Sequence, residues 1–319
     1  MKKIRIFNIF LILIIFILTS CKLSGSAYEK DPILAFDSYI QIVFYNEDHN
    51  EEYNVIKNKF LELDRDSTCY SSNSTNTSIY DLNKDRTKVV SDELIKLLVK
   101  SKELKEETNG YFNPFIGRIT DLWKKAIIEE NIPSDDVIRN ELDIMNNTEL
   151  EIEGNSVSIV GEGNIDLGAI VKGYALDWAK EYLKESNITD YYINSGSSSI
   201  YSKHDINLSI RKPYNSGYIK QFKLNNLGVS TSSPEFQYKN INNYRYHHLI
   251  SGITGYPVNI YDSVSVISEN NLYNDCFSTA IFSMELDDAI KFSNNKNIKI
   301  ILFKDNNILY ESSGISGEN

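Results

Sequence analysis

The stretch from Ile165 to Asp177 constrains the fold more than any other part of this chain. It reads IDLGAIVKGYALD, and it leads from the end of an apolar strand, through an acid, a glycine and a Lys-Gly pair, into a helix. Apolar residues at helical spacing indicate that this helix continues to about Ser186. Just upstream, residues 149–153 and 156–160 alternate around a Gly-Asn turn, which is typical of a hairpin. A hairpin that leads into a helix favours locally paired strands over strict β-α-β alternation.

The rest of the chain repeats this arrangement of short strands and separate helices. Strands are predicted at 33–45, 190–194, 206–211, 218–224 and 262–268, with a final hairpin at 298–310. Helices are predicted at 51–64, 92–108, 273–285 and 287–293, the second capped by Ser91. No repeat period and no linker divides the chain. We therefore predict an α+β fold with mixed, largely antiparallel sheets and packed helices, in a single domain spanning residues 33–311.

The N-terminal residues have the layout of an export signal. Lys2, Lys3 and Arg5 form a positive region at the start, and the stretch from Ile4 to Leu18 is otherwise almost wholly apolar and short for a membrane span. The following LTSC (18–21) resembles the lipobox of bacterial lipoproteins. We therefore expect a signal peptide at 1–20, a lipid on Cys21, a tether at 21–32, and a frayed end at 312–319. The protein would face the periplasm or exterior, anchored to the bacterial cell membrane.

Charge and cysteine content exclude two classes of protein. The whole chain carries a formal charge of −11, and removal of the basic signal would make it more acidic still. A nucleic-acid partner requires a basic face, so none is expected. Beyond Cys21 only Cys69 and Cys276 remain, which excludes a disulfide framework and leaves open whether these two pair.

Lys172 and Gly168 suggest two interpretations of the opening stretch. The spacing fits neither a Walker A loop nor a G-x-G-x-x-G fingerprint. Gly168 permits a close backbone approach, and free amides at a helix start favour anions. A lysine in the first turn opposes the helix dipole and therefore needs an anionic partner. That partner is either Asp166, in a structural salt bridge, or a ligand phosphate.

Two further segments carry candidate chemistry. Asp275 and Thr279 are one turn apart on a predicted helix, so a carboxylate and a hydroxyl share a face, as a Mg²⁺ site requires. A hydroxyl bonded to its own helix beside a surface acid is the alternative. His247 and His248 precede a Gly-Tyr-Pro turn, and neighbours on a strand point apart. One of the two histidines is therefore expected to meet a ligand. The polar residues 71–78 form either a flexible loop or a ligand loop.

Taken in order, these blocks resemble the ApbE-type FAD:protein FMN transferases. IDLGAIVKGYALD is followed by YINSG (192–196), VSTS (229–232), HLISGITGYPV (248–258), SVSVI (263–267) and DCFST (275–279). Upstream, CYSSN (69–73), LN (82–83), GYFNPFIG (110–117) and LW (122–123) fit the same pattern. The resemblance covers roughly residues 33–305. A lipoprotein signal, such as the one expected at residues 1–20, is also common among exported members of the family.

The resemblance implies a reaction in which FAD is the substrate. Mg²⁺ bridges the FAD pyrophosphate, FMN passes to a Thr or Ser hydroxyl of an exported or membrane redox protein, and AMP is released. The implied metal ligands are Asp275, Thr279 and the backbone carbonyl of Ala169. The implied catalytic residues are Lys172, Asp275 and His248. The residues implied to bind the nucleotide are Gly168, Lys172, Gly173, Asp177, Ser230, Thr231, Ser232, His248 and Asn113.

The chain departs from the family pattern at several positions. Ser197 and Ser233 replace expected glycines, residues 251–253 replace an Asp-Pro-Arg, and FDSY (36–39) stands where a Met-Gly-Thr-like segment is usual. The metal and phosphate blocks are intact, so phosphate chemistry is expected to persist. Two alternatives remain open, an Mg²⁺-dependent FAD pyrophosphatase that yields FMN and AMP, and a non-catalytic FAD-binding lipoprotein.

Overall fold

The computed structural model describes residues 26–196, 198–315 and 317–318. The predicted signal peptide, Cys21 and Ser197 lie outside the described residues. The described chain folds around one large sheet in which the strand order does not follow the chain order. All of its strand pairs are antiparallel, in line with the predicted largely antiparallel sheet. Its order is β1-β3-β7-β8-β11-β14-β15-β16, with β2 paired to β3.

The strands of the large sheet come from both ends and the middle of the chain. They are β1 (Ala27–Glu29), β2 (Ile33–Ala35), β3 (Ser38–Tyr45), β7 (Tyr191–Ser195), β8 (Ser199–Ser202), β11 (Leu227–Ser232), β14 (Ser263–Ser268), β15 (Lys299–Lys304) and β16 (Asn307–Glu311). Three smaller sheets surround it. They contain β9 (Ile206–Arg211), β10 (Tyr218–Leu224) and β17 (Gly317–Glu318); β4 (Thr87–Val89), β5 (Glu149–Glu153) and β6 (Ser156–Val160); and β12 (Tyr238–Ile241) with β13 (Tyr244–His247).

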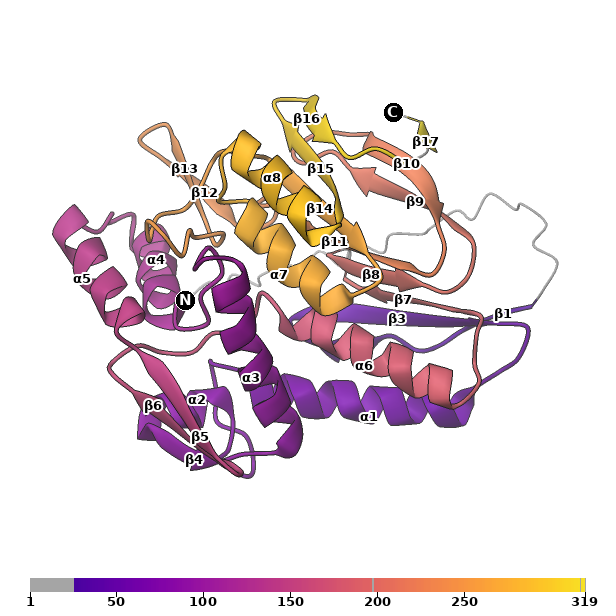
Figure 1. Ribbon diagram of the computed structural model, residues 1–319, viewed down its shortest axis with the longest axis horizontal. Helices are drawn as coiled ribbons and strands as arrows, with labels where there is room; N and C mark the ends of the chain where they lie inside the picture. The colour runs from indigo at the N-terminus through magenta and orange to yellow at the C-terminus, as the bar shows by residue number, and fades with distance from the viewer. Residues whose placement is uncertain (1–25, 197, 316, 319) are drawn as a thin grey trace, which may run out of the picture.

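Helices cover one face of the large sheet and build a separate lobe at its side (Figure 1). The helices are α1 (Asn50–Ser67), α2 (Ile79–Asp85), α3 (Asp92–Glu107), α4 (Gly117–Glu129), α5 (Asp135–Asn146), α6 (Val171–Glu185), α7 (Asn271–Ile281) and α8 (Leu286–Lys296). The lobe consists of α2 to α5 with β4, β5 and β6. None of the described helices is long and apolar enough to cross a membrane.

Three hydrophobic clusters hold these layers together. The largest joins the lobe to α7 and α8, and a second fills the space between α1, α6 and the strands β2, β3 and β7. The third lies on the opposite face, where Val229 and Ile267 meet Phe222 of β10. Helix α7 is buried on nearly all sides, since nine of its eleven residues are buried. A helix in that position can place polar side chains only where the surrounding structure provides partners.

The predicted strand at 33–45 is a tight hairpin. Phe36 and Asp37 both have positive φ, 55° and 53°, and turn the chain between β2 and β3. The Phe36 amide donates a hydrogen bond to the Asp64 carboxylate at 2.7 Å, and this contact from α1 holds the turn. Phenylalanine is rare in a left-handed turn, so the local sequence carries no turn signal here.

Both ends of the described chain contain more structure than the sequence indicates. Ala27–Glu29, inside the expected tether, pairs with β3 as an edge strand, because backbone pairing needs no apolar side chain. Gly317–Glu318, inside the expected frayed end, pairs with β10. A Cβ on Gly317 would lie 1.8 Å from the Gln221 carbonyl oxygen, so this approach requires glycine. The ordered part of the chain therefore extends beyond the predicted limits of 33 and 311.

Two questions left open by the sequence are answered in the described chain. Cys69 and Cys276 are both free thiols, and Cys276 is fully buried in α7. The polar loop 71–78 is a built turn, in which the Asn73 side chain accepts from the amides of Thr75 and Thr77. The loop ends in Ser78, which caps α2 in a capping box with Asp81.

Candidate functional site

The segment before α6 is fixed from two sides. The side chain of Asn83 exchanges two hydrogen bonds with the backbone of Ile165, at 2.7 and 2.9 Å. Asp166 accepts a hydrogen bond from the Gly168 amide at 2.9 Å and so stabilises the turn itself. Of the two partners considered for Lys172, Asp166 therefore has a structural role of its own.

Gly173 allows α6 and α7 to cross at close range. A Cβ at this position would lie 2.1 Å from the backbone oxygen of Asn271, which cannot move aside. The Gly173 amide donates to Oδ2 of Asp275 at 2.5 Å. Among the described residues this amide does not bond the carbonyl of Ala169, four positions back, as a continuing helix would require. The Ala169 carbonyl is therefore free of a helical hydrogen bond.

Asp275 is a buried carboxylate held at both oxygens. It is 6% exposed, and its Oδ1 accepts from the Ser199 hydroxyl at 2.5 Å. Burial raises the pKa of Asp275, while Lys172, the hydroxyls of Ser199 and Ser230 and the Gly173 amide act in the opposite direction. The carboxylate also compensates the partial positive charge at the N-terminus of α6.

Lys172 is close to two other residues predicted from the sequence. Burial raises the pKa of Asp275 and lowers that of His248, and the Lys172 charge is near enough to both to act on each of them, downward in both cases. Lys172 is half-buried, and within the described chain its ammonium forms neither an ion pair nor a hydrogen bond with a neighbour. A half-buried cation without a bound acceptor is suited to an anionic ligand.

The oxygen atoms at this crossing fit a hard cation. Thr279 follows Asp275 by one helical turn, and its hydroxyl lies 3.5 Å from that of Ser232. With the free Ala169 carbonyl, the donors are one carboxylate, one hydroxyl and one backbone oxygen. No group of three or more His, Cys, Asp or Glu side chains that could hold a metal occurs among the described residues. Mg²⁺ bound through a single carboxylate takes its remaining ligands from water and phosphate, so this donor set suits it only beside a phosphate ligand.

The two adjacent histidines point apart, as predicted. His247 is fully buried, packs edge-on against Phe282, and accepts a hydrogen bond at Nδ1 from the Leu249 amide. His248 is open to solvent, yet protein surrounds its ring closely enough that desolvation, with Lys172 and Lys124, lowers its pKa to about 4. With its pKa lowered in this way, the exposed His248 ring is neutral at pH 7.

The three hydroxyls of β11 do not share one face. Successive strand residues point to opposite sides, so Ser230 and Ser232 face α7 while Thr231 faces away and bonds Ser265 at 2.8 Å. Ser232 bonds Ser278 of α7 at 2.9 Å. Thr231 thus lies on the opposite face of β11 from Ser230 and Ser232, and contact of any of the three with a nucleotide stays a prediction.

Two other predicted ligand contacts have structural partners. Asp177 accepts from the Leu272 amide at 2.8 Å, from the Asn271 side chain at 2.9 Å and from Lys180 at 2.8 Å, so it caps α7. Asn113 is buried and accepts from the amide of Phe115, which fixes the turn before α4. Neither observation tests contact with a nucleotide, and that role remains a prediction for both residues.

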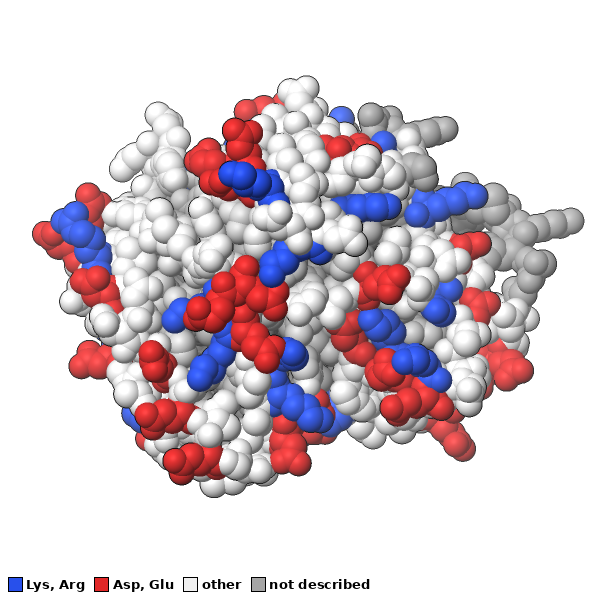
Figure 2. Space-filling view, viewed as in Figure 1, with Lys and Arg blue, Asp and Glu red and all other residues white. Residues whose placement is uncertain are grey.

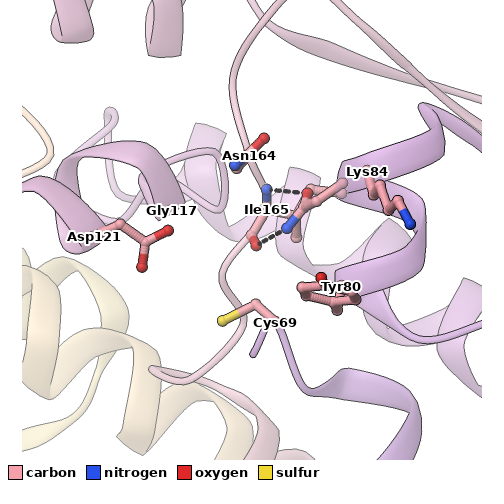
Figure 3. A pocket seen from close by; sticks show the side chains of 8 residues that line it. Cys69, Tyr80, Lys84, Gly117, Asp121, Asn164 and Ile165 are labelled. Atoms are coloured by element: carbon pink, nitrogen blue, oxygen red, sulfur yellow. Dashed lines mark hydrogen bonds between the residues drawn. The ribbon is translucent and has the colours of Figure 1, made fainter. Parts of the chain in front are cut away.

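A cavity of about 190 Å³ lies beside the entrance to α6 (Figure 3). Asp121 of α4 and Cys69 reach its edge from different elements, and burial raises the pKa of both side chains, that of Cys69 to about 12. The cavity is lined by Cys69, Tyr80, Asn83, Lys84, Gly117, Asp121, Asn164 and Ile165.

On the face shown in Figure 2, basic and acidic side chains are interspersed.

Ser199 is the site residue that the sequence did not indicate. It is the first residue of β8, directly after a serine-rich turn, and neither periodicity nor a motif separates it from its neighbours. Its partner Asp275 is 76 positions away in the chain.

Comparison with known proteins gives a consistent result. The sequence profile of the ApbE family matches residues 36–302. An FAD:protein FMN transferase of Klebsiella pneumoniae is 27% identical over 201 residues, which cover 61% of this chain and 63% of the relative. One of Rhodobacter capsulatus is 28% identical over 218 residues, or 66% of this chain and 42% of the relative. These matches thus span less than two thirds of either relative's length. The crystal structure of the ApbE protein from Thermotoga maritima shares the fold, with a TM-score of 0.76 at 23% identity, over 87% of this chain and 94% of that one.

Proposed function

The chain belongs to the ApbE family, and from this premise we propose that it is an FAD:protein FMN transferase. It would move FMN from FAD to a Thr or Ser hydroxyl of an exported or membrane redox protein and release AMP. The observation that carries the proposal is the convergence of Lys172, the amide end of α6 and the buried Asp275. Such a site can bind a pyrophosphate and stabilise charge on it during transfer at phosphorus.

The residues divide the work of this reaction. The acceptor oxygen attacks the phosphorus of the FMN half, the bond from that phosphorus to the bridging oxygen breaks, and AMP leaves with the electron pair. The neutral His248 takes the proton of the acceptor hydroxyl, since an imidazole with a pKa of about 4 is unprotonated at neutral pH. Lys172 neutralises a non-bridging oxygen.

Mg²⁺ would be held by Asp275, Thr279 and the Ala169 carbonyl, and when bound it supplies positive charge to the pyrophosphate. Gly173 keeps the helix crossing close, so that these oxygens and the α6 amides face one ligand. The hydroxyls of Ser230 and Ser232 lie on the same side of β11.

Incubation with FAD, Mg²⁺ and a threonine-containing acceptor domain tests the proposal. Intact mass spectrometry of the acceptor should show one added FMN, and AMP should appear in equal amount. Free FMN without the adduct would establish the pyrophosphatase reaction instead. Tight binding of FAD without turnover would establish a non-catalytic flavin carrier. Asp275→Asn and chelation of Mg²⁺ should each abolish the adduct.

The location of the protein is a second part of the proposal. The LTSC sequence at 18–21 supports a lipid on Cys21, which would place the site on the outer side of the cell membrane together with exported acceptors. The wild-type chain should partition into the detergent phase of a Triton X-114 extract, and Cys21→Ser should shift it to the aqueous phase. Equal partitioning of the two would contradict the anchor.

A further inference from the structure

Three buried serines lie side by side beneath α7. Ser199 of β8 pairs in register with Ser195 of β7 on one side and with Ser230 of β11 on the other. They are 0%, 0% and 1% exposed, and the row continues into Ile40 and Val266. Register partners share a face, so three hydroxyls cross a sheet face that is otherwise apolar along this row.

The row is costly as a purely structural feature. In the described chain the hydroxyls of Ser195 and Ser230 have no partner in hydrogen-bond geometry, although Ser230 is near enough to Asp275 to lower the pKa of its carboxyl group. A buried hydroxyl without a partner costs about 1–3 kcal/mol. Alanine or valine would fill the same positions at no such cost. The serines therefore need an explanation beyond packing.

Ser199 supplies that explanation through Asp275. The hydroxyl of Ser199 and the amide of Gly173 reach different oxygens of the carboxylate, both at 2.5 Å, from two different elements. Two such bonds fix both side-chain torsions of Asp275, because rotation about either would break one of them. Each carboxylate oxygen keeps a second lone pair for another partner.

We propose that Ser199 is a positioning residue for Asp275, which orients the carboxylate toward a divalent cation bound with a phosphate ligand. This inference rests on the proposed function and adds one residue to the same site. A cation ligand whose orientation is set by a second residue loses affinity when that residue is removed, typically by about 10- to 100-fold.

The same strand offers a matched control. Ser202 of β8 is also fully buried, and its hydroxyl donates to the backbone oxygen of His204 at 2.7 Å. Ser202→Ala and Ser199→Ala each remove one buried hydrogen bond, so the two variants should lose similar thermal stability. Only Ser199→Ala removes a contact with Asp275.

The test is a titration of the purified full chain with Mn²⁺ in the presence of FAD, with free Mn²⁺ measured by electron paramagnetic resonance. We expect Ser199→Ala to weaken Mn²⁺ binding about 10- to 100-fold and Ser202→Ala to leave it unchanged. Ser199→Cys, which preserves size with a weaker donor, should lie between them.

The outcomes separate this inference from the proposed function. Equal Mn²⁺ affinity in the Ser199→Ala and Ser202→Ala variants would overturn the inference, whatever the transferase activity. Wild-type chain that binds Mn²⁺ with FAD but never modifies an acceptor would overturn the transferase proposal and leave the positioning role supported. Absence of Mn²⁺ binding by the wild-type chain would overturn both the inference and the metal part of the proposed function.

Discussion

Two aspartates on the same pair of helices occupy contrasting surroundings. Asp177 of α6 caps α7, and Asp275 of α7 caps α6. Asp177 already has a lysine bound to it, and two further donors from α7 complete its contacts. Asp275 is more deeply buried, and the nearby Lys172 is not bound to it. The contrast separates a carboxylate satisfied by its own protein from one whose neighbouring cation still lacks an acceptor.

Replacement of Asp275 should have the largest effect on FMN transfer. Asp275→Asn preserves shape and one acceptor oxygen but removes the negative charge that we propose holds the cation. We expect FMN transfer to fall by at least about 100-fold, measured as the rate of adduct formation on the acceptor. Retention of full Mg²⁺-dependent activity would show that the metal assignment is wrong.

Lys172 and Lys180 should differ in how much each contributes to FMN transfer. Lys172→Met removes the unbound cation, and we expect transfer to fall by about 10- to 100-fold with weaker FAD binding. Lys180→Met removes the cation that is already paired with Asp177, and transfer should change little. Equal losses of kcat/KM for FAD in the two variants would contradict the distinction between the surroundings of Asp177 and those of Asp275.

The buried His247 should make the stability of the fold depend on pH. Burial lowers the pKa of His247 to about 4, so the folded state keeps it neutral while the unfolded chain protonates near its usual pKa of about 6.5. The unfolded state therefore binds more protons between these values, and stability should fall as pH drops from 6.5 to 4, by up to about 3 kcal/mol. Urea unfolding across this range should show the fall, and His247→Phe should reduce it. An unchanged pH slope in that variant would exclude His247 as the cause.

Removal of the structural cap should have the smallest effect on activity. Asp177→Asn leaves a weaker cap on α7, with a loss of about 1–2 kcal/mol of unfolding free energy and transfer reduced by less than tenfold. Thermal unfolding and the rate of adduct formation measure the two effects. If Asp177→Asn instead impairs FAD binding while stability is unchanged, Asp177 contacts the nucleotide, as the sequence resemblance implied.

The sequence predicted those parts of the fold that carry local signals. The hairpin at β5 and β6 turns at Gly154-Asn155, and the apolar spacing of α6 gives its length to within one residue. Strands β8 and β11 were not predicted as strands, since SIYS and LGVSTS lack regular alternation and are shaped by their neighbours. Helix α5 was missed because few of its side chains are buried.

The candidate site shows the same limit. Lys172, Asp275 and Thr279 could be selected because motifs place them. The partners that decide their roles could not, since the Ser199 hydroxyl and the capping of α7 by Asp177 both depend on contacts distant in sequence. The motif groups Thr231 with Ser230 and Ser232 because they are neighbours in sequence, whereas the strand turns the Thr231 side chain to the opposite face.

The reciprocal caps also have a consequence for how the protein matures. They join residues 95 and 102 positions apart, and the five strands from β7 to β11, the β12–β13 hairpin and β14 lie between the two helices. During synthesis from the N-terminus, α6 therefore stays without its cap until α7 has also been synthesised and has packed against it. The contacts between α6 and α7 thus form only when nearly the whole chain is in place, so an incompletely synthesised chain would lack the site.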